Sequence, residues 1–433
     1  MKLLTTRQAS HLPPRPKSRA LLAFVWGLGG CLAGMGVFPA LSLRDLGVIS
    51  QGTFMLASGL LVAVPSLACA VLLAARRRAA TPHVVRLIRG LLFAAWAAAA
   101  VPLIAGVVGW VSPAPGARLC AVWALRGVAA IAAFLVARAF VAGDRRARNY
   151  LSGMVASGIL LEACSLIWRN PSYGSRLGSS LNPNGVGWLA CALLFAAPVL
   201  YGRRGLAVAA PSALFIVASG SRTAAVSAIA GVVLLALLWA RQRISLRAPR
   251  TWLRAWGAAA LVAVVAASAA ASAHRIADRF LATSSRGGVS TLERRLALDE
   301  GMLTAFKASP AIGQGNQDPV FEDQYGIEFR SHNSYISILY GGGLLSAVPA
   351  FAAMAVVIAL VVLRRVQAVW AALFVAGLVT AITEDVLFKY EIASHMLWQI
   401  AFWAVAFTAA RQRSAAASRR LVSPQARVAF RHG

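Results

Sequence analysis

The chain has few charged residues for its length, and acidic residues are much scarcer than basic ones. Of 433 residues, 13% are charged and only 14 are Asp or Glu, whereas 59% are hydrophobic. The mean hydropathy is +0.69. A soluble globular domain carries roughly 25% charged residues, so this composition excludes that class and predicts a membrane protein.

Cysteine is also scarce. The five cysteines lie in apolar segments, and no two have the CxxC spacing of a zinc or redox site. Cys120 and Cys164 both fall near the outer ends of predicted helices and could pair, but we expect buried free thiols. The sequence therefore predicts neither a disulfide framework nor a zinc site.

Long apolar runs occupy most of the chain. A helix needs roughly 20 apolar residues to cross the hydrocarbon of a bilayer. About twelve runs approach that length, near residues 20–40, 46–75, 90–111, 117–142, 149–168, 183–201, 205–219, 222–240, 252–272, 334–363, 368–388 and 394–410. Unpaired backbone cannot face lipid, so these runs must be helices. The predicted fold is an all-α polytopic membrane protein with about twelve spans, of which 205–219 is the shortest.

The basic residues gather in alternate loops between these runs. A net charge of +29 looks at first like a sign of nucleic-acid binding. However, the arginines cluster within residues 76–89, 145–148, 203–204, 241–254 and 364–365, and at both termini. The positive-inside rule places these loops and both termini in the cytoplasm, so the charge reports topology and no nucleic-acid partner is expected.

This topology divides the chain into five parts. A basic cytoplasmic N-terminus (1–19) precedes spans one to nine (20–272), one large outer loop (273–331), spans ten to twelve (332–410) and a basic cytoplasmic tail (411–433). The tail is rich in small and basic residues, and we expect it to be disordered.

The outer loop contains one predicted amphipathic helix. Residues 290–293 have the Ser-x-x-Glu pattern of a capping box, and Ser309-Pro310 ends the helix. Its apolar residues recur at helical spacing: Leu292, Leu296, Leu303 and Phe306. We expect this apolar stripe to pack on the membrane-spanning body.

Two arginines of this helix are predicted to point in different directions. At about 100° per residue, Arg295 falls on the edge of the apolar stripe and Arg294 on the opposite side. Arg295 would then face the membrane-spanning body, and Asp299, one turn later, could hold its guanidinium in place. An amphipathic helix with solvated charges explains the same pattern equally well.

Four acidic residues follow this helix: Asp318, Glu322, Asp323 and Glu328. They could bind a divalent cation, but their spacing matches no calcium-binding loop and contains no DxD pair. A solvated acidic loop is the favoured interpretation, and we expect no metal site.

Two tight outer turns precede predicted helices. In the turn at residues 219–223, Arg222 starts a helix, where the macrodipole disfavours a bare cation. An arginine there makes most sense beside an anion, because helix N-termini and guanidinium groups both bind phosphate. A snorkelling interface arginine is the alternative. In the turn at residues 181–185, the amide of Asn184 could cap the helix or hydrogen-bond a sugar.

Several charged residues lie inside or at the ends of predicted spans. Arg126 and Glu162 lie at similar depth in the fourth and fifth spans, and charges inside a membrane usually pair. An ion pair that supports a cavity is one interpretation, and direct substrate contact is the other. Glu384 and Asp385, near the outer end of the eleventh span, leave the same two interpretations open.

His332 lies where the outer loop meets the tenth span. The positive end of a helix penalises protonation of an imidazole, so a neutral histidine is favoured there, as a general base near neutral pH requires. A structural histidine is the alternative.

Several short segments around this loop occur together in one known family. They are Asn182-Pro183-Asn184, Gly220-Ser221-Arg222-Thr223, Arg295 followed by Pro310 and Gly313-Gln314-Gly315, His332-Asn333-Ser334-Tyr335 and Gly342-Gly343-Leu344-Leu345. In these segments, over residues 181–345, the chain resembles the O-antigen ligase family, part of a larger group that includes O-antigen polymerases. One departure is Asp299, where relatives often carry an aromatic residue.

The resemblance implies a glycosyltransferase of the bacterial inner membrane with a periplasmic active site. Such enzymes move a glycan from undecaprenyl diphosphate to a hydroxyl acceptor, which for ligases belongs to lipid A-core. It implies that Arg222 and Arg295 stabilise the diphosphate and that His332 deprotonates the attacking hydroxyl, with inversion and without a metal or cofactor. The residues expected to support them are Asn184, Asn333, Arg126 and Glu162.

Two alternatives stay open. An O-antigen polymerase would use the same residues with a growing glycan as acceptor, and the sequence barely separates the two. A twelve-span secondary transporter is the alternative from a different class. Against it stand the lack of internal repeats and the position of the large loop after the ninth span, whereas a two-halved carrier is more naturally divided after the sixth.

Overall fold

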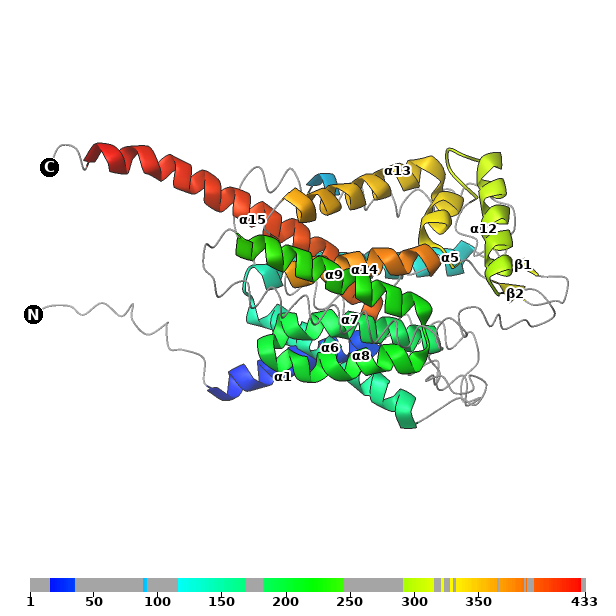
Figure 1. The fold of residues 1–433 in the computed structure, drawn as a ribbon, viewed down its shortest axis with the longest axis horizontal. Helices are drawn as coiled ribbons and strands as arrows, with labels where there is room; N and C mark the ends of the chain where they lie inside the picture. The colour runs from blue at the N-terminus through cyan, green and yellow to red at the C-terminus, as the bar shows by residue number, and fades with distance from the viewer. Residues whose placement is uncertain are drawn as a thin grey trace, which may run out of the picture.

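Long apolar helices form a bundle, and one further helix lies across its end (Figure 1). The computed structural model describes residues 16–35, 89–91, 116–167, 182–244, 291–314, 321–322, 328–329, 332–363, 366–384, 387 and 393–429. The described helices are α1 (Pro16–Met35), α5 (Gly116–Val141), α6 (Arg145–Ile167), α7 (Pro183–Tyr201), the 3-10 helix η2 (Gly202–Gly205), α8 (Leu206–Ser219), α9 (Arg222–Ile244), α12 (Thr291–Ala308), α13 (Ser334–Leu363), α14 (Ala368–Thr383) and α15 (Ala393–Ala429). A short antiparallel pair is formed by β1 (Phe321–Glu322) and β2 (Glu328–Phe329).

The length and composition of these helices make the chain a multi-pass membrane protein. Among the described residues, the segments long and apolar enough to cross a membrane are Arg145–Ile167, Pro183–Ser219, Arg222–Arg241 and Ser334–Leu363. The second of these folds back at Gly202, which ends α7 with a φ of 59°, so α7 and α8 pack side by side. The predicted runs 46–75 and 252–272, and nearly all of 90–111, lie outside the described residues, so the count of twelve spans stays a prediction.

The ends of several helices agree with the sequence pattern. The predicted runs 183–201 and 334–363 have the same bounds as α7 and α13. Asn182 explains the start of α7, because its side chain accepts a hydrogen bond from the Gly185 amide and Pro183 occupies the first turn. The prediction for the tail is wrong over residues 411–429, where α15 continues as a helix to Ala429. Ala, Arg and Gln, which are frequent in this segment, are strong helix formers and favour the extension of the helix.

The most deeply buried side chains belong to the helices at the centre of the bundle. Cys191 of α7, Trp370 of α14 and Leu397 of α15 are fully buried. In contrast, α8 and α9 expose apolar side chains, with Leu214 at 72% and Leu237 at 62% of full exposure. Such faces suit contact with lipid, which is as apolar as leucine itself. The described thiols of Cys31, Cys164 and Cys191 are free, as expected.

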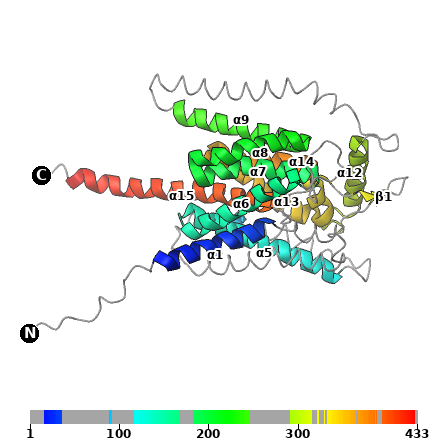
Figure 2. The same ribbon diagram turned by 90° about the horizontal axis from the view of Figure 1, so that it is seen from below.

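Helix α12 lies at the end of the bundle away from the start of α1 and the end of α15 (Figures 1 and 2). The outer-loop helix and the two basic ends of the described chain are therefore on opposite faces. This arrangement is the one that the alternating basic loops predict.

The packed face of α12 differs from the predicted one. Leu298 and Met302 are buried against Tyr340 of α13, whereas Leu296 is 58% exposed. The packed face is rotated by about a third of a turn from the predicted stripe. Arg295 lies three residues before Leu298 and therefore still faces the bundle. The side chain of Arg294 lies outside the description, and the rotation removes the reason to expect it in water.

Candidate active site

Four helix ends meet beneath α12. The starts of α7, α9 and α13 are hydrogen-bonded to the end of α14, and Arg295 of α12 donates to the same place. These hydrogen bonds join segments up to 200 residues apart in the chain. The site is thus built by the tertiary fold and not by any one local motif.

The carboxylate of Glu384 lies at the centre of this site. The residue is only 2% exposed, and it follows directly after α14. One oxygen, Oε2, lies 3.1 Å from His332 Nδ1, and the other, Oε1, accepts a hydrogen bond of 3.0 Å from Asn184 Nδ2. The guanidinium of Arg295 lies 3.6 Å from Oε1. A buried carboxylate is costly unless such donors surround it, so these contacts explain how Glu384 is retained there.

The contact with Glu384 fixes which nitrogen of His332 can act as a base. A carboxylate can only accept hydrogen bonds, so Nδ1 carries the hydrogen when the imidazole is neutral. The lone pair then lies on Nε2, which has no hydrogen-bond partner among the described residues. The side chain of His332 is 36% exposed. It can therefore reach a substrate while the carboxylate holds its ring.

The start of α13 holds His332 in place. The Asn333 side chain caps the helix by accepting hydrogen bonds from the amides of Tyr335 (3.0 Å) and Ile336 (3.3 Å). Ser334 donates to the carbonyl of Glu384 at 2.9 Å. Burial raises the pKa of Asp299, and this rise is opposed by its interaction with His332, a hydrogen bond with Asn333 and the charge of Arg295.

The two arginines predicted to bind diphosphate lie close together. The positive charges of Arg222 and Arg295 are near enough to repel each other. Arg295 donates from Nη1 to the Thr383 carbonyl at 3.1 Å, and its Nε is buried without an acceptor among the described residues. A buried N–H without an acceptor is unfavourable. An anion between the two guanidinium groups would accept a hydrogen bond from this Nε and would also screen the repulsion between the two positive charges.

Asp299 interacts with Arg295, as predicted, but it is not the only partner of the guanidinium. The charges of Asp299 and Arg295 attract each other, while Arg295 also donates to the Thr383 carbonyl and contacts the Glu384 carboxylate. Asp299 also shares a hydrogen bond with the side chain of Asn333 at the start of α13.

Paired hydroxyl groups fasten the start of α9 to the end of α14. Thr223 and Thr383 are joined by a hydrogen bond of 2.6 Å, and Ser227 and Thr380 by one of 2.8 Å. Arg222 precedes Thr223 directly and is thereby placed next to the Glu384 site. The short side chains allow these two helices to approach closely.

A kink in α13 holds α12 over the site. Gly343 has φ 58° and ψ −159°, a conformation open almost only to glycine. The helix is broken there, and the amides of Leu344 and Leu345 donate to the carbonyls of Pro310 (2.8 Å) and Ala311 (3.0 Å). The turn after α12 is thus bonded to the kink, which explains why two glycine-rich segments of the family pattern occur together.

We expect the Gly343→Ala variant to lose stability and donor binding together. A Cβ on Gly343 would collide with the backbone of Ala311, and the strained conformation adds about 1–3 kcal/mol. Thermal unfolding in detergent and binding of the donor lipid measure the two effects. Gly127→Ala is the control, because a Cβ there meets nothing within 4 Å. Equal behaviour of the two variants would contradict this role of the kink.

The structure brings together most of the predicted site residues. Arg222, Arg295, His332, Asn184 and Asn333 all lie at this end of the bundle. Two supporting residues are not placed with them. The buried carboxylate of Glu162 contacts Ser212 of α8 at 3.4 Å, and the side chain of Arg126 lies outside the description.

The sequence did not identify Glu384 as the central residue. The available signal was a carboxylate at the outer end of a predicted span, but its partner His332 is 52 residues away. The acidic residues Asp318 and Asp323 lie outside the described residues. Only the backbone is described at Glu322 and Glu328, in β1 and β2. Within the described part of the chain, no three His, Cys, Asp or Glu side chains gather as metal ligands would.

Comparison with known proteins bears on the same residues. Residues 207–351 match the family model described as O-antigen ligase. This segment runs from α8 into α13 and contains Arg222, Arg295 and His332, but it ends before Glu384. The comparisons with curated proteins and with solved structures gave no match. The match confirms the predicted resemblance to the O-antigen ligase family over residues 207–351.

Proposed function

We propose that this protein transfers O-antigen polysaccharide from undecaprenyl diphosphate to lipid A-core, on the periplasmic face of the bacterial inner membrane. The observation that carries the proposal is His332, held by a buried carboxylate that also contacts Arg295, with the charge of Arg222 close to that of Arg295. A base next to an anion-binding pair is what transfer from a diphosphate carrier to a hydroxyl requires.

The arginines supply the donor site of the proposed reaction. Arg222 and Arg295 bind the diphosphate of the carrier lipid, and Arg295 offers the otherwise unsatisfied Nε. Negative charge grows on the departing oxygen as the glycosidic bond breaks, and guanidinium groups neutralise it through charge-assisted contacts. The proposed transfer is therefore metal-independent.

His332 acts in this scheme as the general base. Its Nε2 accepts the proton of an acceptor hydroxyl on lipid A-core as that oxygen bonds to the anomeric carbon of the glycan. The bond between the anomeric carbon and the diphosphate oxygen breaks on the opposite face, which inverts the configuration. Glu384 accepts the hydrogen bond from Nδ1 and stabilises the imidazolium that forms.

The direct test is reconstitution. Purified protein should join a lipid-linked glycan to lipid A-core in buffer that contains excess EDTA, and the product should be seen by gel mobility and mass. If glycan chains instead lengthen on the carrier lipid, the protein is a polymerase of the same family. Movement of lipid or solute without any new glycosidic bond would favour a transporter and contradict the proposal.

We expect thiol labelling in intact cells to show the proposed orientation. A cysteine in place of Gln317, in the outer loop, should react with a membrane-impermeant thiol reagent. A cysteine in place of Arg247, in a basic loop, should be protected until the cells are opened. The reverse pattern would place the His332 site in the cytoplasm and overturn the proposal of a periplasmic reaction.

A further inference from the structure

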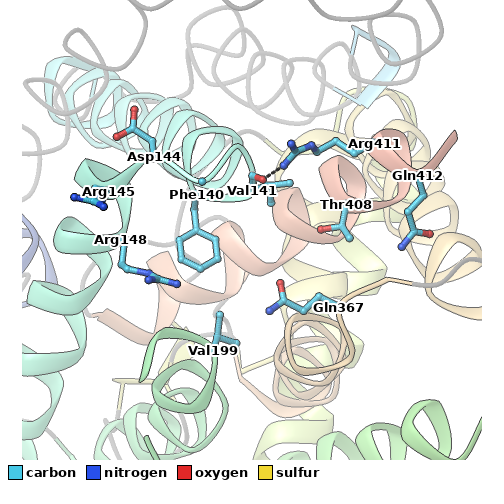
Figure 3. A pocket seen from close by; sticks show the side chains of 11 residues that line it. Phe140, Val141, Asp144, Arg145, Arg148, Val199, Gln367, Thr408, Arg411 and Gln412 are labelled. Carbon is cyan, nitrogen blue, oxygen red and sulfur yellow. Dashed lines mark hydrogen bonds between the residues drawn. The ribbon is translucent and has the colours of Figure 1, made fainter. Parts of the chain in front are cut away.

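A polar cavity lies at the end of the same helices that is opposite to the candidate active site. Its volume is about 550 Å³, and it lies between the end of α5, the starts of α6 and α14, the end of α7 and the middle of α15 (Figure 3). Helix α7 runs from Asn184 in the active site to Val199 in this cavity, and α14 runs from Gln367 in the cavity to Glu384. The 16 residues of α14 span about 24 Å at 1.5 Å per residue, so the cavity and the candidate active site lie at opposite ends of the bundle.

Positive charge dominates the cavity. Arg145 and Arg148 extend from the first turns of α6, and Arg411 extends from α15 on the other side (Figure 3). One carboxylate, that of Asp144, is present among the lining residues. Its Oδ1 accepts a hydrogen bond from the Arg146 amide at 2.9 Å and so caps α6. Three guanidinium groups against one carboxylate leave a site suited to an anion.

The three arginines line a hollow between the helices and are not spread over a flat surface. Arg411 donates a hydrogen bond to the carbonyl of Val141, which fixes α15 to the end of α5. The hydrogen-bonding side chains of Gln367 and Thr408 also line the cavity, below Arg411 in the view of Figure 3. Ligand sites in proteins commonly have volumes of roughly 300–1,000 Å³, so the cavity is large enough for a phosphate ester.

Apolar side chains form the remaining wall. Phe140, Val141 and Val199 line the cavity beside the charged groups. A free inorganic anion gains nothing from such a wall, whereas a phospholipid presents a phosphate joined to an apolar body. Basic pockets between membrane helices are suited to anionic lipid headgroups in the same way.

We propose that this cavity binds the phosphate headgroup of an anionic phospholipid from the membrane leaflet opposite to the active site. Arg145 and Arg148 contact the phosphate from α6, and Arg411 contacts it from α15. The apolar wall receives the part of the lipid nearest the headgroup. Because the ligand joins α5, α6, α7, α14 and α15, its binding stabilises the helices that carry Asn184 and Glu384.

The test measures lipid retention without any glycan substrate, so its outcome is independent of the proposed transfer reaction. The protein is purified in mixed micelles that contain phosphatidylglycerol or phosphatidylcholine, and bound lipid is counted by native mass spectrometry. Wild-type protein should retain phosphatidylglycerol in preference to phosphatidylcholine. The Arg145→Gln, Arg148→Gln double variant should retain less phosphatidylglycerol, by a factor of roughly ten or more.

Two further variants separate a built site from general surface charge. Arg204→Gln removes a charge from η2, on the same face but not in the cavity lining, and should leave retention unchanged. Gln367→Trp keeps the net charge and fills the cavity from an exposed position, so it should abolish retention. Inorganic phosphate added in excess should not displace the lipid.

Four outcomes would overturn the proposal. They are normal retention in the double variant, normal retention in Gln367→Trp, an equal loss in Arg204→Gln, and displacement of the lipid by inorganic phosphate alone. The last would mean that the cavity takes a free anion. Size-exclusion profiles of all variants guard against misfolding, and Gln367→Trp tests the site even if the double variant does not fold.

Discussion

The His332→Ala variant should bind the donor lipid normally and transfer glycan roughly 10²–10⁴-fold more slowly, the usual contribution of a general base. Binding should survive because His332 contacts Glu384 through Nδ1 and leaves the diphosphate to the two arginines. Donor binding and product formation are measured on the same preparation. Full transfer activity in the variant would remove His332 from the mechanism.

The same experiment reveals whether Glu384 acts through His332. Glu384→Gln keeps the shape of the side chain but loses the charge that holds Nδ1–H, so transfer should fall. Donor binding should remain, because Arg295 keeps its hydrogen bond to the Thr383 carbonyl. In the His332→Ala background, the same substitution should cause little further loss, because the two residues work as one unit. If the two substitutions together reduced transfer by the product of their separate effects, Glu384 would have a role that is independent of His332. Glu300→Gln, an exposed residue of α12, is the matched control.

Arg222→Ala and Arg295→Ala should weaken donor binding as well as turnover. In the proposed site each guanidinium contacts a multiply charged diphosphate away from bulk water, so each loss should weaken binding by roughly ten- to a hundredfold. Lysine should rescue poorly, because it lacks the two-pronged geometry of arginine. Binding of undecaprenyl diphosphate in detergent measures the effect.

The control for the arginine variants is Lys307→Ala. Lys307 is an exposed basic residue in the last turn of α12. Its replacement by alanine removes one positive charge from the same helix, as Arg295→Ala does. It should leave binding within about twofold of wild type, as expected for a surface charge. Should Arg295→Ala bind the donor as well as Lys307→Ala does, the diphosphate site lies elsewhere.

The sequence alone predicts those features of the structure that depend on residues close together in the chain. Asn182 and Pro183 mark the start of α7, and Asn333 marks the start of α13, because a cap acts on the next few amides. The sequence predicts the two arginines and His332 as site residues for a similar reason. Each is a charged or titratable residue at the start of a helix or on one face of it, where an isolated charge needs an explanation.

The rest required contacts between distant segments. Nothing near Glu384 in the sequence indicates that His332, Asn184 and Arg295 surround it, since each partner belongs to another helix. The face of α12 was misjudged because α13 presents Tyr340 to Leu298, and the spacing within α12 does not record its partner. The sequence also does not predict the cavity at the opposite end of the bundle, because the positive-inside rule is enough to explain the arginines that line it.

The anomeric configuration of the new glycosidic bond tests the account most directly. If His332 activates the acceptor hydroxyl for a single displacement of the diphosphate, the configuration must invert. An α-linked donor should therefore give a β-linked product, as read by NMR on glycan joined to lipid A-core by the purified protein. A product that retains the donor's configuration would require a second displacement and would contradict direct attack assisted by His332.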